Sequence, residues 1–403
     1  MVILSMAWRN LLLVPLILFG GCSTISSHRS IDNDVQIVKP AGEISEGQLL
    51  DVWIELFEPG ELEDAEDNSE GLSMDIREAE ARYMPVLLRD TMEKTGYWGA
   101  VRVVPRGTEG GEVLVQGVIL ESDGEQLELN ITALDASGRK WFSSTYEAEV
   151  TLQEYQDSEL SGQDVFQSLF NAIANDLAVY RATLESADIL TIRRIAALRF
   201  DADLAPDVFS GYLQHSDEDE FTIVRLPAKD DPMVQRVRAI RERDFLLIDT
   251  LNGHFDNFNQ NMQDPYMQWR KTRLEELESL RAIQSEARKR KLLGAAAIIG
   301  AIAIEVMGSN STRASTGTLR NVMVVGGAYA IKTGFDKDSE TTIHRDAIEE
   351  LGDSFSAETK PLVVEVEGET HELTGSAEVQ YAKWRALLKQ IYATETGLPE
   401  TVN

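Results

Sequence analysis

The chain is poor in cysteine and histidine, the residues that build disulfides and many metal sites. Its 403 residues contain one cysteine, Cys22, and five histidines. A single thiol excludes an intramolecular disulfide and a structural zinc site built from thiolates. The histidines are scattered without the spacing of metal ligands, at positions 28, 215, 254, 344 and 371. On these grounds we expect neither a metal nor a cofactor.

Basic side chains are also few. The sequence has 38 Lys and Arg against 68 Asp and Glu, and its formal net charge is −30. Because nucleic-acid affinity depends on neutralising phosphates with Lys and Arg, this balance predicts no nucleic-acid partner. It also disfavours docking of the whole protein on an anionic lipid surface by charge alone. A second interpretation is that the acidity serves only solubility.

The familiar catalytic patterns are missing as well. The sequence has no Gly-x-Ser-x-Gly elbow, no Gly-x-x-x-x-Gly-Lys phosphate loop and no His-Glu-x-x-His zinc helix. The acidic stretch at residues 64–70 offers oxygen ligands to a hard cation, but it lacks the EF-hand pattern and is better explained as a solvated loop. The sequence therefore predicts no catalytic residue and no metal ligand, and favours a protein that is not an enzyme.

What the sequence does have begins at its N-terminus. Arg9 precedes an apolar run at residues 11–19, and Gly20-Gly21-Cys22-Ser23 follows. A basic start, an apolar run and small residues before a cleavage site are typical of a secretory signal. The stretch Leu18-Phe19-Gly20-Gly21-Cys22 resembles the lipobox of bacterial lipoproteins.

This resemblance implies that residues 1–21 are a signal peptide and that Cys22 is acylated as the first residue of the mature chain. Two or more acyl chains make such anchoring stable. The resemblance also implies an outer-membrane location, because Ser23 stands where an Asp retains such proteins at the inner membrane. The alternatives are an ordinary membrane-spanning signal anchor and a cysteine that stands at this position by chance.

The next two segments predict a tether and a folded domain. Residues 22–45, rich in Ser, Asp, Lys and Pro, are expected to form a lipidated tether. Residues 46–185 predict an α/β sandwich domain with an antiparallel sheet, in a protein of the α+β class. We expect a first strand within residues 49–57, helices at 74–94 and 164–185, and a meander of strands at 100–104, 112–120, 126–134 and 141–150.

One strand of this domain shows the pattern of a half-buried sheet. Leu127, Leu129 and Ile131 alternate with polar residues, as in a sheet with one wet face. The order of the expected elements resembles the periplasmic α/β modules of the curli secretion channel lipoprotein and of TolB. Those modules are docking platforms without a catalytic centre, so the resemblance implies a role in protein contacts.

Residues 186–291 predict a mainly helical domain. Apolar residues at helical spacing favour one helix at 233–262. Asp264-Pro265 then reads as the start of another helix, which contains Leu274 and Leu277. We expect the two helices to pack as a long hairpin in the manner of a coiled coil.

Residues 292–335 predict an apolar hairpin rich in Gly and Ala. A basic cluster at 288–291 precedes an apolar run at 292–307, and a polar linker leads to a second run at 322–331. Small residues stand four apart in both runs: Ala296 and Gly300, then Gly326, Ala330 and Gly334. Such spacing lets helices approach closely and resembles the glycine-zipper segments of envelope lipoproteins. The hairpin is expected either to contact a membrane or other copies, or to be buried inside an ordinary helical domain.

The last segment, residues 336–403, predicts a small α+β cap with a strand hairpin at 362–374 and a terminal helix at 377–392. The whole pattern favours a non-enzymatic outer-membrane lipoprotein that faces the periplasm. Anchored through Cys22, it would act as a scaffold or assembly factor by contacts with envelope proteins or with its own copies. The alternative is an oligomeric component of an export or secretion assembly, with residues 292–331 inserted in the membrane. An envelope hydrolase with an unrecognised carboxylate pair is a third hypothesis.

Overall fold

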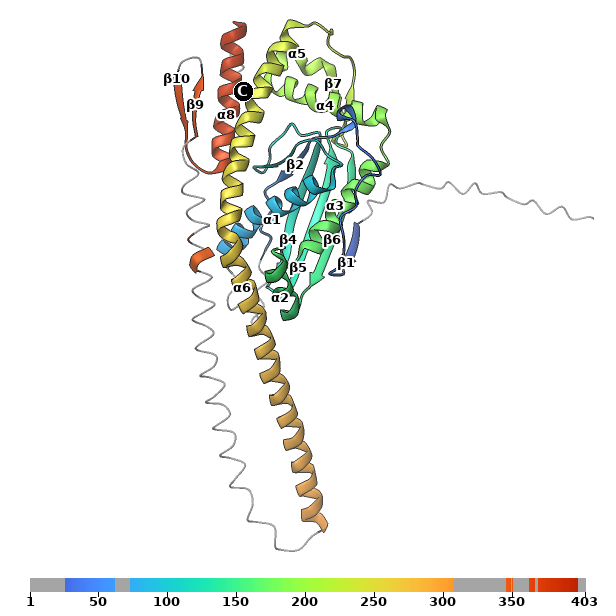
Figure 1. Cartoon of the computed structure of the whole chain (residues 1–403), viewed down its shortest axis with the longest axis vertical. Helices are drawn as coiled ribbons and strands as arrows, with labels where there is room; N and C mark the ends of the chain where they lie inside the picture. The colour runs from blue at the N-terminus through green and yellow to red at the C-terminus, as the bar shows by residue number, and fades with distance from the viewer. Residues whose placement is uncertain are drawn as a thin grey trace, which may run out of the picture.

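A mixed six-stranded sheet lies at the centre of the computed structural model, which describes residues 26–61, 73–307, 346–348, 350, 362–366 and 369–397 (Figure 1). The strands in order across the sheet are β1 (Ser26–Ser30), β6 (Lys140–Glu149), β5 (Gln126–Asp135), β4 (Val113–Ser122), β2 (Val52–Glu55) and β3 (Val101–Val104). Only β5 runs antiparallel to its neighbours; the β1–β6, β2–β4 and β2–β3 pairs are parallel. The fold is therefore mixed α/β, which is compatible with the α+β class.

The expectation of an antiparallel sheet is wrong, and the connections explain why. β2 and β3 are joined through α1 (Met74–Thr95), and a crossover helix makes the strands that it joins parallel. Ser73 caps the start of α1, where its side chain accepts the Ile76 N–H, and Gly96, with φ of 78°, caps its end. The tight turns on both sides of β5 were visible in the sequence, but they fix only the β4–β5–β6 meander.

Two helices cover one face of this sheet. α1 and α3 (Gln167–Ala182) pack on the face that carries Ile54, Leu129 and Ile131, all fully buried. The predicted alternation along β5 is confirmed, because Leu127, Leu129 and Ile131 are buried and their neighbours are half exposed. The helix expected from residue 164 begins at Gln167, and a separate helix, α2 (Leu152–Ser161), precedes it.

Residues expected to form a tether belong to the sheet. β1 pairs with β6 from Ser26 to Ser30, and the Ile31 N–H donates to the Glu147 carbonyl over 2.8 Å. Side chains of α3 then bind the following segment, because Asn171 donates to the Val35 carbonyl and Asn175 to the Gln36 carbonyl, both over 2.8 Å. The tether expectation missed this strand because its polar sequence carries no strand pattern of its own.

The region expected to be mainly helical also contains a small hairpin. α4 (Ser186–Leu204) and α5 (Pro206–Phe209) precede β7 (Leu213–His215) and β8 (Phe221–Ile223), which pair antiparallel. Short 3₁₀ turns occur at Glu46–Gln48 and Ser210–Tyr212. On the second face of the sheet, Trp53 packs with Phe200 of α4 in one apolar cluster.

A single helix replaces the predicted helical hairpin. α6 (Pro232–Met307) has 76 residues and contains Pro265, so the expected break at Asp264-Pro265 is wrong. Tertiary packing overrides the proline, since Met262, Tyr266 and Trp269 on both sides of it are fully buried. At about 1.5 Å per residue α6 is roughly 114 Å long. It runs beside the β3 edge and extends past the sheet (Figure 1).

The C-terminal helix packs on the first part of α6, and the preceding strand hairpin contacts that C-terminal helix. β9 (Leu362–Val366) and β10 (Glu369–Leu373) form the expected hairpin, and α8 (Ala377–Thr396) is the expected terminal helix. α8 contributes Trp384 and Leu388 to an apolar cluster with Val237 and Ile240 of α6. Among the described residues, no helix combines the length and the apolar character needed to cross a membrane.

Candidate functional site

The second face of the sheet is the strongest candidate site. Helices pack over it near Trp53, and farther along β4, β5 and β6 it carries half-exposed or exposed polar side chains. Neighbouring strands are linked there by side-chain hydrogen bonds, between Thr132 and Ser143 over 2.9 Å and from Asn130 to Thr145 over 3.1 Å. These bonds hold the polar side chains in place, so the face has a fixed shape.

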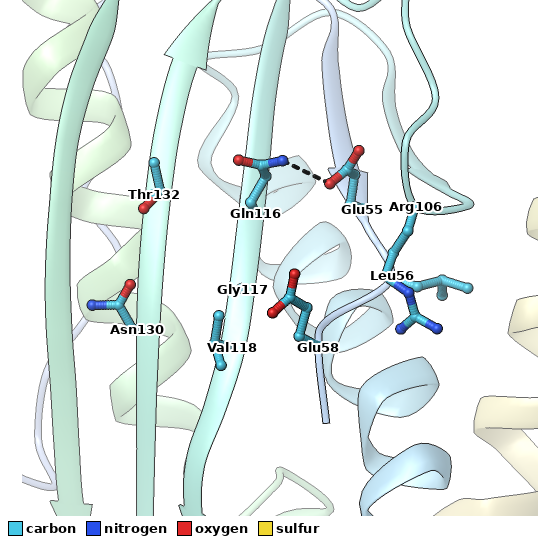
Figure 2. Close-up of a pocket in the computed structure, with 9 residues that line it drawn as sticks. All are labelled: Glu55, Leu56, Glu58, Arg106, Gln116, Gly117, Val118, Asn130 and Thr132. Carbon is cyan, nitrogen blue, oxygen red and sulfur yellow. Dashed lines mark hydrogen bonds between the residues drawn. The ribbon is translucent and has the colours of Figure 1, made fainter. Parts of the chain in front are cut away.

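A hollow of about 130 Å³ lies on this face (Figure 2). It is lined by residues of β2, β4 and β5 and of the segments that follow β2 and β3: Glu55, Leu56, Glu58, Arg106, Gln116, Gly117, Val118, Asn130 and Thr132. The carboxyl ends of parallel strands are the usual place for ligand sites in α/β sheets. The hollow lies at the carboxyl ends of β2 and β3, so its position fits that rule.

Glu55 is the fixed point of the hollow. Its side chain is 7% exposed, and both carboxylate oxygens accept hydrogen bonds of 2.9 Å, from the Gly107 N–H and from the Gln116 amide. Figure 2 shows Glu55 and Gln116 pointing toward one another from adjacent strands. Because these bonds satisfy the buried carboxylate, it shapes the wall of the hollow and fixes the loop that follows β3.

Arg106 and Gly117 shape the remainder of the hollow. The Arg106 guanidinium donates to the Phe57 carbonyl over 2.7 Å, while its side chain stays exposed. At Gly117 a Cβ would lie 2.5 Å from the Phe57 ring, so the close approach of Phe57, which follows β2, to β4 requires glycine here. The exposed Glu58 carboxylate and Arg106 together give the rim opposite charges.

A larger cleft of about 470 Å³ continues from Arg106 toward α8. It lies between the loop after β3 and α8, and its charged lining residues are Arg106, Glu109, Asp203, Glu378, Arg385 and Lys389. Arg385 binds both Asp203 and Asp244, the latter over 3.2 Å, and Lys389 binds Asp203 over 2.8 Å. Burial raises the pKa of Asp244, against the opposing effect of Arg385.

A row of glutamates crosses the other end of the same face. Glu121, Glu128 and Glu147 are register partners on β4, β5 and β6, and His28 of β1 lies 2.7 Å from Glu147. Burial raises the pKa of Glu121, and the charges of Asp123 and Glu128 raise it further. Like charges opposite one another repel and destabilise a sheet. A basic partner would relieve this repulsion and an anionic partner would increase it, so the row favours basic partners. No group of three or more His, Cys, Asp or Glu among the described residues is arranged to hold a metal ion.

The structure places only part of the sites predicted from sequence. Ala296 and Gly300 lie on the α6 backbone beyond Arg281, whose ion pair with Glu125 joins α6 to the β4–β5 turn. Cys22, Gly326, Ala330 and Gly334 lie outside the described residues.

Sequence reasoning missed the hollow and the cleft. The one local signal was Glu55, an acidic residue inside the otherwise apolar stretch at residues 52–57. Its partners Gly107 and Gln116 come from segments more than 50 residues away, which no local pattern connects. Comparison of the chain with protein-family models, with curated proteins and with solved structures finds no match.

Proposed function

We propose that the chain is a non-enzymatic lipoprotein of the bacterial outer membrane, anchored at Cys22 and facing the periplasm, which acts as a scaffold or assembly factor. The lipobox-like stretch at residues 18–22 supports the location. In this proposal residues 292–335 are an apolar hairpin and residues 336–403 a small α+β cap.

The observation that carries a scaffold role is the polar second face of the sheet. Its hollow of about 130 Å³ is smaller than the roughly 300–1,000 Å³ of typical small-molecule pockets, and its polar groups are fixed by bonds to one another. The adjoining cleft of about 470 Å³ falls inside that range, but Asp203, Arg385 and Lys389 in its lining are paired with one another. Such a surface suits a protein partner that inserts one side chain, with the glutamate row next to basic groups of the partner.

Site-specific cross-linking in cells tests this role. A photo-cross-linking residue at the exposed Glu58 lies at the rim of the hollow and keeps the Glu55–Gln116 bond, and one at the exposed Gln153 of α2 is a control of similar size. We expect a discrete cross-linked envelope protein from position 58 and none from position 153. The same products from both positions, or none from either, would contradict a docking face at the hollow.

The length of α6 supports a second candidate, an oligomeric export or secretion component. Its last part, with the apolar residues 292–307, extends beyond the sheet (Figure 1). A Cys22→Ala variant and a deletion of residues 292–331 separate the two candidates when cells are fractionated. Where residues 1–21 have been cleaved, the Cys22→Ala protein is soluble under the scaffold proposal, whereas a second membrane element keeps the cleaved protein membrane-bound. A ring-sized complex after detergent extraction also favours the export component.

A further inference from the structure

The folded part of the chain begins very close to the proposed lipid. β1 starts at Ser26 and is paired with β6 from that residue on, through Ser143. Only residues 23–25 separate it from Cys22. At about 3.6 Å per residue, a fully extended connection from Cys22 to Ser26 spans at most roughly 14 Å. A lipid on Cys22 therefore holds the start of β1 next to the bilayer surface.

The position of β1 then determines which side of the molecule faces the lipid. β1 is one edge strand of the sheet, and α6 lies beside β3, the opposite edge. Five strand spacings of about 4.8 Å separate β1 from β3, a distance of roughly 24 Å. Figure 1 shows β1 and α6 on opposite sides of the sheet.

Exposed apolar side chains occur beside the start of β1. Arg29 pairs with Asp176 of α3, and Tyr180 of α3 stacks on Trp141 at the start of β6, with 4.7 Å between ring centroids. This end of α3 therefore lies at the end of the sheet where β1 begins. Val179 of the same helix turn is 61% exposed.

Val38 extends this apolar surface. Its N–H donates over 2.7 Å to Asn175, one helical turn before Val179, and its side chain is 45% exposed. The next residue, Lys39, is exposed and positively charged. Apolar side chains with an adjacent cation suit the surface of a bilayer that contains anionic lipids.

We propose that the β1 edge of the sheet, with Val38 and Val179 beside it, rests on the bilayer that holds the Cys22 lipid, and that the packed part of α6, from Val237 to Leu277, lies on the side away from it. This deepens the proposed function, on which it rests. The β1 edge is the membrane-facing surface, and the packed part of α6 faces the aqueous space where protein partners are met.

Fluorescence quenching by lipids tests this orientation on the lipidated chain in vesicles of phosphatidylethanolamine and phosphatidylglycerol with a nitroxide-headgroup lipid. Since Cys22 is the only cysteine, an introduced thiol is the only free one once Cys22 is acylated. Val179→Cys carries the probe near β1, and Leu246→Cys on α6 is the matched control, 67% exposed against 61%. We expect several-fold stronger quenching at position 179 than at position 246.

A longer linker separates the geometric argument from general membrane affinity. Insertion of about 20 Gly and Ser residues after Ile25 adds roughly 25 Å of mean reach. We expect the insertion to reduce the difference between the two probes. Equal quenching at both positions without the insertion, or stronger quenching at position 246, overturns the proposal.

Failure of this orientation can be distinguished from failure of the proposed function. The mass of the N-terminal peptide reports directly whether Cys22 is acylated. If it is not, the anchor of the proposed function fails, and a histidine tag in place of residues 1–22, bound to nickel-chelating lipid, attaches the chain at the same point. The quenching pattern then decides the orientation on its own.

Discussion

Buried charge is concentrated where α6 meets the sheet domain. Arg270 is 2% exposed, binds Asp164 through a 2.6 Å contact and lies 4.2 Å from the centre of the Tyr266 ring. Next to it, fully buried Glu80 accepts hydrogen bonds of 2.6 Å from Ser122 and Tyr266. Burial raises the pKa of Glu80, although Arg77 lies beside it and lowers it. These residues fix α6 against α1 and the β4–β5 turn.

The Arg270–Asp164 pair gives a first prediction. Asp164→Asn keeps the shape of the side chain but leaves a buried guanidinium uncompensated, so we expect about 3–5 kcal/mol of destabilisation. Urea unfolding measures it. The neighbouring Lys271–Glu159 pair, 2.7 Å apart on the surface, provides the control. Glu159→Gln should leave the midpoint unchanged, and equal effects of the two substitutions would show that the burial of Arg270 is unimportant.

Asp201 predicts a pH dependence. Burial raises its pKa to about 6, although Arg241 and Arg238 lower it in part. Because the folded pKa exceeds the usual value of 3.8, the stability that protonated Asp201 contributes is present below about pH 4 and is lost as the pH rises through 6. Asp201→Asn removes this loss, so its stability relative to the wild type should rise by roughly 2–3 kcal/mol from pH 4 to pH 7. Parallel stability–pH curves from urea unfolding would contradict this.

At the scale of elements, one side chain of α6 closes the edge of the sheet. Asn252 accepts the Val103 N–H and donates to the Val103 carbonyl, each over 2.9 Å, as a neighbouring strand would. An unprotected edge invites pairing with other chains. Asn252→Ala should destabilise the fold by about 2–3 kcal/mol and speed amide exchange at Val103. The exposed Asn257 of α6 is the matched control, and Asn257→Ala should change neither quantity.

Pro265 gives the second prediction at this scale. A proline inside a helix removes a hydrogen bond and costs about 3 kcal/mol, and part of this is offset because proline restricts the unfolded chain. Pro265→Ala should therefore stabilise the protein by about 2 kcal/mol in thermal unfolding. Asn261→Ala, at an exposed site of the same helix, should change the free energy of unfolding by only about 0.5 kcal/mol. A destabilised Pro265→Ala protein would mean that the buried side chains around it require a kinked helix.

The same elements show what sequence can and cannot predict. The strands β4, β5 and β6 and the helices α1 and α8 were predicted within a few residues, because apolar periodicity and turn residues are local signals. The helix break predicted at Pro265 is absent because Met262 and Tyr266 pack against distant segments. The tether prediction missed β1 because this strand forms by pairing with β6, more than 100 residues away. The hollow at Glu55 is likewise assembled from three distant segments.

At the scale of the whole molecule, α6 joins two parts with different environments. From Val237 to Leu277 it carries side chains buried against the sheet domain and α8, and Arg281 pairs with Glu125 at the end of the β4–β5 turn. From there to Met307 it continues for about 26 residues, roughly 39 Å. Under the proposed function this last part, with residues 292–307, is available to a membrane or to another copy.

Amide hydrogen exchange along α6 tests this division. Helices without tertiary packing are marginal in water, so we expect slow exchange from Val237 to Leu277 and exchange faster by orders of magnitude at 292–307 in the Cys22→Ala protein. Vesicles containing phosphatidylglycerol should slow exchange at 292–307 if this segment binds lipid. Protection there that grows with protein concentration and needs no lipid would instead indicate association between copies. Slow exchange at 292–307 in dilute protein without lipid would mean that these residues form a buried hairpin, and their proposed contact with membrane or partners would be wrong.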